Sequence, residues 1–189
     1  MQQRIILASA SPRRRELLQM LGLAFEVRPA RGEERMPQGA APDELVMALS
    51  RQKAEELAAP DAIVIGADTV VALDGVILGK PKDAEDAKRM LLKLSGRRHT
   101  VYTGVTVLRG STMLSRAERT EVFFRPLDGD EIERYVATGE PLDKAGAYGI
   151  QGFGSLFVER IEGDFFNVMG LPLCCLGKML KDLGGVTLL

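Results

Sequence analysis

The segment AIVIGADTVVALDGVILGK, residues 62–80, carries the strongest fold signal in the chain. Its first part, residues 62–73, is a nearly continuous apolar run rich in Val and Ile, which predicts a buried β-strand. The dipeptide Asp74-Gly75 supplies the positive φ angles of a two-residue hairpin turn. Residues 76–78 are therefore expected to return as an antiparallel partner of the first strand.

Outward from this hairpin, the hydrophobic pattern alternates between strand and helix signals. We expect further strands at residues 4–8, 25–28, 101–109, 113–124 and 155–162, and helices at residues 12–21, 43–59, 83–94, 128–138 and 172–183. The polar stretch between the second strand and the second helix, residues 30–42, is a loop long enough to suggest a function. Because helices alternate with strands and hairpins are present, the pattern predicts an α/β or α+β protein with a mixed β-sheet.

Length and composition fit one compact domain. The chain has 189 residues, of which 46% are hydrophobic and 27% charged, so there is enough apolar side chain to close a core. We expect a single domain spanning residues 1–189, with room for two lobes. The net charge of −1 draws the chain neither to nucleic acid nor to a membrane surface, so neither is expected as a partner. A bound anion must be held by a local cluster of cations.

The lack of long apolar segments and the small number of cysteines and histidines restrict the expected location of the protein and the metals it could bind. The first residues lack the long apolar run of a secretion signal, and no stretch approaches the roughly 18 apolar residues of a membrane span, so we expect a cytoplasmic protein. The only cysteines, Cys174 and Cys175, are adjacent in an apolar stretch and are interpreted as reduced core residues. His99 is the only histidine and is interpreted as structural. A bound metal would therefore be a hard ion such as Mg²⁺ or Mn²⁺, held by oxygen atoms.

The segment SASPRRR, residues 9–15, places three arginines where a helix disfavours cations. Ser11 is a suitable N-cap and Pro12 a suitable first helical residue, so the arginines fall in the first turn, at the positive end of the helix dipole. A hydroxyl-bearing loop and the unpaired N–H groups of a helix can bind an anion, and arginine forks match phosphate oxygens. The segment is either a phosphate site or a solvated basic turn.

Lys53 interrupts the apolar stripe of its predicted helix. It lies between Leu49 and Leu57 in a series of four-residue steps, on the side expected to be buried. Either its stem covers apolar surface while the ammonium reaches solvent, or the ammonium points into an anionic site at the edge of the core.

Asp68 lies in the middle of the apolar strand. An ionised carboxylate there costs several kcal/mol unless it is paired or bound to a metal. The hairpin register carries Lys80 to a place opposite Thr69, one residue from Asp68. One interpretation is a simple ion pair between Asp68 and Lys80. The other is a carboxylate that holds a metal or activates water, beside a lysine that binds phosphate.

Two further segments are ambiguous on their own. The stretch AGAYGIQGFG, residues 145–154, has four glycines, which allow the backbone to approach a ligand closely, and Gln151 is an amide able to contact a base or a sugar. Glycine-rich strand ends are also common without any ligand. Glu33 and Glu34, in the long loop, are either solvated charges or a source of one more oxygen ligand for a metal at Asp68.

In their order along the chain, these motifs resemble the Maf family of nucleoside triphosphate pyrophosphatases, once named for inhibition of septum formation. The similarity covers essentially the whole chain, through SASPRR (9–14), EE (33–34), RQKA (51–54), GADTVV (66–71), GKP (79–81), SGRRHTVYTGV (95–105), DKAGAYGIQG (143–152) and VMGLPL (168–173). The resemblance implies an ITPase-like α/β fold, in which helices and an elongated mixed β-sheet form two lobes around a central cleft. It also implies a homodimer.

The resemblance implies an activity and a set of site residues as well. The family hydrolyses a nucleoside triphosphate to the monophosphate and diphosphate with a divalent metal, Mg²⁺ or Mn²⁺. Asp68 matches the family's proton acceptor and, with Glu34, its metal site, while the phosphate-handling positions match Ser9, Arg14, Lys53 and Lys80. The positions that sort substrates match Arg13, Thr69 and Gln151, and the sequences Asp-Thr and Tyr-Gly-Ile-Gln resemble the branch that acts on dTTP and UTP.

The main hypothesis is thus a house-cleaning pyrophosphatase for dTTP, UTP and modified pyrimidine nucleotides, with a possible link to the arrest of cell division. Two alternatives stay open: a pyrophosphatase for 7-methyl-GTP or other purine nucleotides, and a non-catalytic nucleotide sensor that regulates septum formation. The pattern GxxxxGK[ST] is absent from the sequence, which disfavours a P-loop ATPase that releases orthophosphate.

Overall fold

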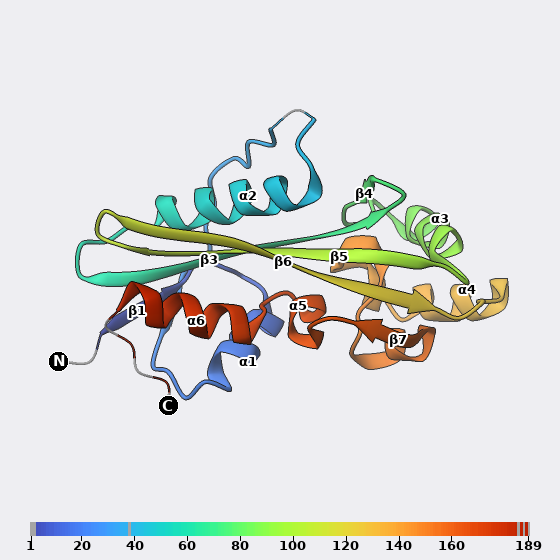
Figure 1. Ribbon diagram of the computed structural model, residues 1–189. Coiled ribbons are helices and arrows are strands. Elements are labelled where there is room, and N and C mark those ends of the chain that lie inside the picture. The colour runs from blue at the N-terminus through green and yellow to red at the C-terminus, as the bar shows by residue number, and fades with distance from the viewer. Residues whose placement is uncertain (1–2, 38, 185, 187, 189) are drawn as a thin grey trace.

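The computed structural model describes residues 3–37, 39–184, 186 and 188, which form an elongated, twisted mixed sheet with helices on both faces (Figure 1). The sheet has seven strands in the order β2-β1-β3-β5-β6-β7, and β4 pairs with β3 beside this path. The strands are β1 (Arg4–Leu7), β2 (Glu26–Val27), β3 (Ala62–Leu73), β4 (Val76–Leu78), β5 (Arg98–Arg109), β6 (Thr112–Phe124) and β7 (Val158–Glu162). Strands β2, β1 and β3 are parallel and the other pairs antiparallel, which confirms the predicted mixed sheet.

The helices cover the two faces of this sheet, with α2 on one face and α1 and α6 on the other (Figure 1). They are α1 (Pro12–Gln19), α2 (Pro42–Glu56), α3 (Ala84–Leu94), α4 (Gly129–Ala137), α5 (Phe165–Met169) and α6 (Leu173–Leu183). Short 3₁₀ turns are η1 (Glu140–Asp143), η2 (Ala145–Ala147) and η3 (Gly152–Phe157). None of the described helices is both long enough and apolar enough to cross a membrane.

Several element predictions were wrong in detail, including the start of β5, which lies at Arg98 and not at residue 101. Helix α2 begins at Pro42 with Ala41 as its N-cap, one residue earlier than expected, because proline already has the φ angle of a first helical residue. Strand β7 begins at Val158 because residues 152–157 form η3. Helix α5 was not predicted, since a five-residue helix is too short to show a helical period.

Strand β3 organises the molecule because its two edges are used differently. One edge pairs with β5 over residues 63–72. The other edge pairs with β1 over residues 62–65 and with β4 over residues 71–73. Between these two partners, residues 66–70 have no neighbouring strand on that edge within the described part of the chain. Asp68 stands in the middle of this gap.

Helix α2 lies close against the sheet because two strand positions have no side chain. A Cβ atom on Gly66 would lie 2.2 Å from the Ser50 carbonyl oxygen, and a Cβ atom on Gly104 would lie 2.2 Å from the Val46 carbonyl oxygen. Gly104 is the ladder partner of Asp68, and Gly66 is two residues before it, so all three face α2. The two glycines therefore let α2 bring its side chains to Asp68.

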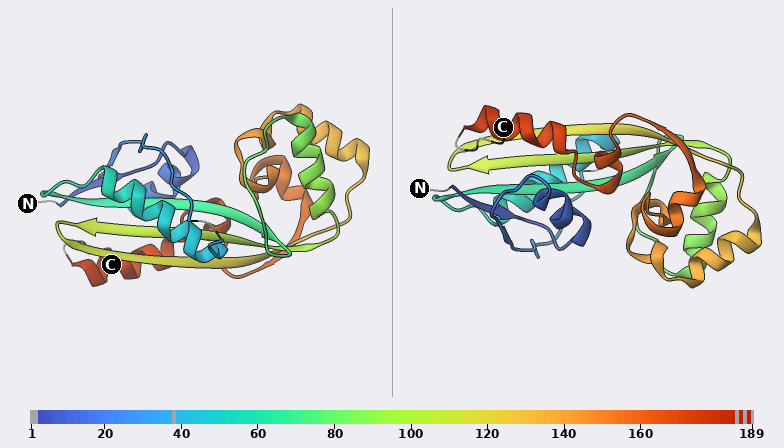
Figure 2. Two further views of the ribbon diagram at one scale, coloured as in Figure 1. Left: turned by 90° about the horizontal axis from the view of Figure 1, so that it is seen from above. Right: turned by 90° about the horizontal axis from the view of Figure 1, so that it is seen from below.

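Two lobes lie at the two ends of the long strands (Figure 2). We call the part built from β1, β2, α1, α2 and α6 the large lobe, and the part built from β4, α3, α4 and the 3₁₀ turns the small lobe. Ile65 and Leu176 belong to the core between α1, α6 and the sheet, whereas Leu91 and Phe124 belong to the core of the small lobe. The gap in the edge of β3 lies where the two lobes meet.

Candidate active site

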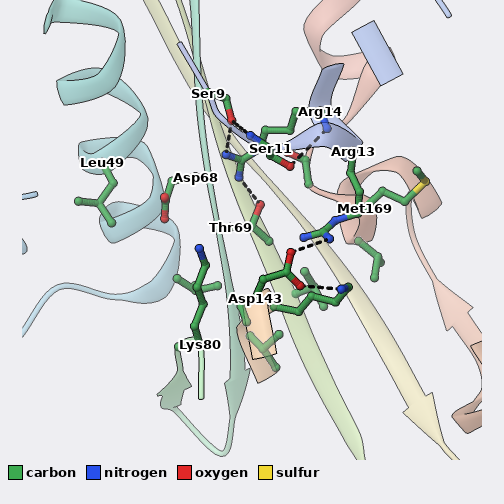
Figure 3. A pocket seen from close by; sticks show the side chains of 18 of the residues that line it. Ser9, Ser11, Arg13, Arg14, Leu49, Asp68, Thr69, Lys80, Asp143 and Met169 are labelled. Carbon is green, nitrogen blue, oxygen red and sulfur yellow. Dashed lines mark hydrogen bonds and ion pairs between the residues drawn. The ribbon is translucent and has the colours of Figure 1, made fainter. Parts of the chain in front are cut away.

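A cavity of about 730 Å³ lies at the open edge of β3, between the two lobes (Figure 3). Its walls come from the loop between β1 and α1, from α2, from the middle of β3 and from residues 143–151. All the site residues predicted from the sequence line it, namely Ser9, Arg13, Arg14, Glu34, Lys53, Asp68, Thr69, Lys80 and Gln151. The structure brings these side chains together, while their individual roles stay predictions.

Arg14 is held by three acceptors. Its Nε donates to the Gly170 carbonyl at 2.8 Å, an Nη2 proton goes to Thr69 Oγ1 at 3.0 Å, and Nη1 donates to Ser9 Oγ at 3.3 Å. Burial lowers the pKa of the guanidinium from its ordinary value, and the negative charge of Asp68 opposes this shift. A guanidinium carries five N–H groups, so part of the donor set of Arg14 remains available to a ligand.

The other two arginines of the first turn are placed differently. Arg13 reaches across the cavity, where its Nη1 lies 3.7 Å from Asp143 Oδ2 of the small lobe. Lys144 Nζ lies 2.7 Å from Asp143 Oδ1. Partial burial acts to raise the pKa of Asp143, but the hydrogen bond and charge of Lys144 together with the charge of Arg13 outweigh it, so the pKa lies below its ordinary value. Arg15 is exposed outside the cavity, so the alternative of a solvated basic turn holds for this arginine alone.

Lys53 joins two carboxylates at the floor of the cavity. Its ammonium forms an ion pair with Asp68 Oδ1 and lies 3.0 Å from Glu34 Oε1. The side chains of Lys53 and Asp68 are only 17% and 14% exposed. The ammonium therefore points into an anionic site at the edge of the core, the second of the two alternatives for this residue, and does not reach out to bulk solvent.

Lys80 lies on the same side of the cavity as Asp68, and Figure 3 shows its side chain pointing toward that carboxylate. The predicted register of the hairpin, with Leu73 paired to Val76, is confirmed. The interpretation of Asp68 and Lys80 as a simple ion pair was wrong, because α2 brings Lys53 to Asp68. The ion pairs of the described residues include none to Lys80.

The small-lobe wall carries Gln151 at the cavity mouth, exposed and next to the 3₁₀ turn η3. Gly146 has a φ angle of 69°, and a Cβ atom there would lie 2.9 Å from Val71 Cγ2. Its backbone N–H donates to the Gly79 carbonyl at 3.0 Å, which ties this wall to the segment that carries Lys80. A glycine is therefore required at this turn by both its backbone angle and the lack of space.

Behind this wall lies a cluster of aromatic rings. His99 is buried, and its Nε2 lies 2.8 Å from the hydroxyl of Tyr148, which lines the cavity. The two rings and Phe124 contact one another edge to face. Burial lowers the pKa of His99 to about 4 and raises the pKa of Tyr148 above its ordinary value, so both groups are neutral near pH 7. His99 supports Tyr148 from outside the cavity.

Some residues near the cavity were not predicted as site residues from the sequence. In the sequence, Asp143 and Lys144 resemble an ordinary solvated pair, since charged neighbours in a loop break no local rule. Gly170 and Thr103 are equally inconspicuous. Their contacts with the cavity residues depend on pairings between distant segments. The only signal in the sequence was membership of the motifs DKAGAYGIQG, SGRRHTVYTGV and VMGLPL.

Two carboxylates, Asp68 and Glu34, are available to a divalent metal. Both contact the ammonium of Lys53, so they face a common point. Within the described ranges of the chain, no group of three or more His, Cys, Asp or Glu gathers into a metal-binding cluster. Mg²⁺ is usually held by one or two carboxylates together with substrate phosphates. The two side chains fit a metal ion whose remaining ligands are phosphate oxygens.

A mixed sheet with a cationic cleft around a partly buried carboxylate defines an α/β protein built to receive a polyanion. A sequence model described as "Maf-like protein" matches residues 4–183, and the chain belongs to this family. Similar proteins include the dTTP/UTP pyrophosphatase of Moorella thermoacetica, 55% identical over 96% of this chain and 95% of that one. The dTTP/UTP pyrophosphatase of Pelotomaculum thermopropionicum is 52% identical over 95% of this chain and 96% of that one.

Solved structures show a more distant likeness. The Ham1 protein of Staphylococcus aureus has a TM-score of 0.46 and 18% identity, over 80% of this chain and 77% of that one. The HAM1 protein of Coxiella burnetii has a TM-score of 0.45 and 16% identity, over 66% and 73%, respectively.

Proposed function

We propose that this chain is a nucleoside triphosphate pyrophosphatase that hydrolyses dTTP, UTP and modified pyrimidine nucleotides to the monophosphate and diphosphate. The observation that carries the proposal is the concentration of cations around Asp68 in a protein whose net charge is only −1. Arg13, Arg14, Lys53 and Lys80 all line one cavity. Such a cluster offsets the charge of a triphosphate. The relatives named above support the choice of dTTP and UTP.

The large-lobe wall is arranged to bind phosphate oxygens. Ser9 Oγ accepts hydrogen bonds from the Ser11 N–H at 3.2 Å and from Arg14 at 3.3 Å, so the hydroxyl proton of Ser9 is left to donate to a ligand. Arg14 offers the N–H groups that its three protein acceptors do not use. In the first turn of α1, Pro12 has no N–H and the Arg14 N–H is capped by Ser11 Oγ, so this turn adds the Arg13 N–H and the positive end of the helix dipole.

Asp68 is proposed as the general base. Lys53 contacts Oδ1 of this carboxylate, which leaves Oδ2 to take the proton of the attacking water. The water oxygen bonds to the α-phosphorus while the bond from that phosphorus to the bridging α–β oxygen breaks. The electron pair leaves on the diphosphate, whose developing charge Arg13 and Lys80 are placed to stabilise. Asp68 and Glu34 would hold a Mg²⁺ or Mn²⁺ ion, which supplies Lewis acidity at the phosphate and a more acidic water.

Gln151 is proposed to sort bases from the small-lobe wall, together with Thr69 and Arg13. A side-chain amide both donates and accepts hydrogen bonds. It therefore complements the N3–H and carbonyl groups that thymine and uracil share. Cytosine presents a different pattern at the same edge, so an amide held in one orientation would discriminate against CTP.

Incubation of the purified protein with Mg²⁺ or Mn²⁺ and a panel of nucleotides tests the proposed activity. We expect dTTP and UTP to give the monophosphate and diphosphate faster than CTP, GTP and 7-methyl-GTP. Release of orthophosphate with a nucleoside diphosphate would contradict the reaction. A preference for 7-methyl-GTP would favour the alternative of a purine nucleotide pyrophosphatase. Tight binding of a nucleotide without turnover would favour the alternative of a nucleotide sensor.

We also propose that residues 1–189 act as one domain and that the protein works as a homodimer in the cytoplasm. The family resemblance supports the dimer. The two cysteines are unpaired, which fits a reducing compartment, although only Cys175 is buried and Cys174, contrary to the expectation of two core residues, is exposed. Light scattering after size-exclusion chromatography tests the dimer directly, because a mass near 20.6 kDa would be that of a monomer.

A further inference from the structure

Thr103 is a buried hydroxyl that lies outside the cavity and is not used in the proposed reaction. It belongs to β5, is 0% exposed and is the ladder partner of Thr69. Its Oγ1 donates to the backbone carbonyl of Asn167 at 2.9 Å and lies 2.9 Å from Thr69 Oγ1. It therefore connects a cavity residue to the backbone of α5.

The direction of these hydrogen bonds follows from the proton count. A threonine hydroxyl has one proton, and a carbonyl oxygen can only accept, so the proton of Thr103 is committed to Asn167. The contact between Thr103 and Thr69 must then use the proton of Thr69. With its own proton turned inward, Thr69 Oγ1 presents only lone pairs to the cavity. One of these lone pairs accepts the Nη2 proton of Arg14.

Helix α5 closes this chain of contacts into a ring. Asn167 is itself fixed, since its Nδ2 donates to Val101 O and to Thr120 Oγ1, both at 3.0 Å. Three residues later, the Gly170 carbonyl accepts the Nε proton of Arg14. Gly170 has a φ angle of 110°, and an added Cβ atom would lie 3.3 Å from Thr69 Oγ1 and 3.5 Å from Arg14 Nε. One short turn thus supplies two acceptors to the ring.

We propose that Thr103 and the α5 turn are a positioning device that fixes the guanidinium of Arg14 before the triphosphate binds, with Thr103 as the positioning residue. Without the Thr103 hydroxyl, Thr69 loses the acceptor that fixes its rotamer. The contact of Thr69 Oγ1 with the guanidinium of Arg14 is then no longer held in place. This inference rests on the proposed function and deepens it, because it assigns the motif VMGLPL to the alignment of a phosphate-binding arginine.

Three variants test the device by their kcat/KM on dTTP. Thr103→Val removes the hydroxyl at constant shape, and Thr103→Ser retains it. Thr106→Val is the matched control, because Thr106 is another fully buried threonine of β5, bonded to Ser50 and Ser115 outside the cavity. We expect Thr103→Val to lose about 10- to 100-fold, and the two other variants to stay within about threefold of the native protein.

The inference is overturned if Thr103→Val keeps its activity, if Thr106→Val loses as much, or if Thr103→Ser is no better than Thr103→Val. If Thr103→Val does not fold, Thr103→Ala, which removes the hydroxyl and leaves more room, takes its place with the same expectation.

A second measurement does not depend on turnover. The Nε–H resonance of Arg14 in ¹⁵N-labelled protein, assigned by its loss in Arg14→Lys, reports how firmly the guanidinium is held. We expect Thr103→Val to speed its exchange with water about tenfold or more, because the ring is opened. Unchanged exchange would refute the positioning role. If the native protein releases no diphosphate from dTTP, the proposed function fails, and the exchange rate still decides whether Thr103 positions Arg14.

Discussion

The two walls of the cleft are built in different ways. The large-lobe wall carries Ser9, Arg14, Lys53 and Asp68 on or beside regular strands and helices, and its side chains are tied together by hydrogen bonds and ion pairs. The small-lobe wall carries Gln151 among 3₁₀ turns and glycines, supported from behind by aromatic rings. The difference suggests a division of labour. The rigid wall carries the catalytic base and most of the residues proposed to bind the triphosphate, and the wall of turns carries Gln151, the amide proposed to contact the base.

The largest effect is expected from Asp68→Asn on the rigid wall. The amide keeps the shape of the carboxylate but cannot take up the proton of water. We expect kcat on dTTP to fall about 1000-fold or more, with the thermal midpoint little changed. The control is Asp143→Asn, which alters a carboxylate of the opposite wall and should cost far less in kcat. Equal losses in the two variants would remove the distinction between the walls.

The next largest effect is expected from a change in the close packing of α2 against the sheet. The contact of Lys53 with Asp68 depends on this packing. Gly104→Ala places a methyl group against the Val46 carbonyl, so the helix must move away from the sheet. We expect a loss of about 2–4 kcal/mol in the free energy of unfolding, together with lower activity. Denaturant titration measures the loss. Gly129→Ala is the control, since no atom lies within 4 Å of its added Cβ, and a similar loss there would argue against the role of close packing.

A smaller effect is expected from pH on the small-lobe wall. Because burial lowers the pKa of His99 to about 4 in the folded protein, the unfolded chain binds a proton near pH 6.5 that the folded chain does not. Stability is therefore complete above pH 6.5 and falls as the pH drops toward 4. His99 should contribute a loss on the order of 2 kcal/mol between pH 7 and 5.

The variant His99→Gln isolates this contribution. Its amide can still bond the hydroxyl of Tyr148, but it does not titrate. The free energy of unfolding measured at pH 7 and pH 5 should differ less in His99→Gln than in the native protein. If the two proteins show the same difference, another group is responsible for the acid sensitivity.

The smallest effect is expected at Gln151. Truncation to alanine removes one contact with the base and leaves the phosphate wall intact. We expect the KM for dTTP to rise about tenfold with kcat nearly unchanged, and the preference for dTTP over CTP to shrink. Steady-state kinetics on both nucleotides measure this. A large fall in kcat at constant KM would instead place Gln151 in the chemical step.

The sequence predicted those features that break a local rule. Asp68 is conspicuous because a carboxylate is rare in an apolar strand, and the dipeptide Asp74-Gly75 specifies the β3–β4 hairpin by its backbone angles alone. Lys53 is conspicuous because a charged side chain interrupts the apolar stripe of its helix. Such anomalies arise from one stretch of chain, so they can be recognised without knowledge of the fold.

Contacts between distant segments could not be predicted in the same way. The partner of Lys53 depends on the seating of α2 against Gly66 and Gly104, which only the packed structure reveals. The ring of Thr103, Thr69 and Arg14 joins positions that are ordinary in their own segments. Helix α5, with five residues, left no periodic signal, although the helix and its C-cap Gly170 each supply one acceptor to this ring.

Asp68, at the open edge of β3, is proposed to activate a water that attacks the α-phosphorus. Hydrolysis of dTTP in water enriched in ¹⁸O tests this proposal most directly. Mass spectrometry of the products from a single turnover locates the label. If Asp68 activates a water that attacks the α-phosphorus, the label appears in dTMP and the diphosphate carries none. Label in the diphosphate would show attack at the β-phosphorus and would contradict the arrangement of catalytic base and phosphate-binding wall described above.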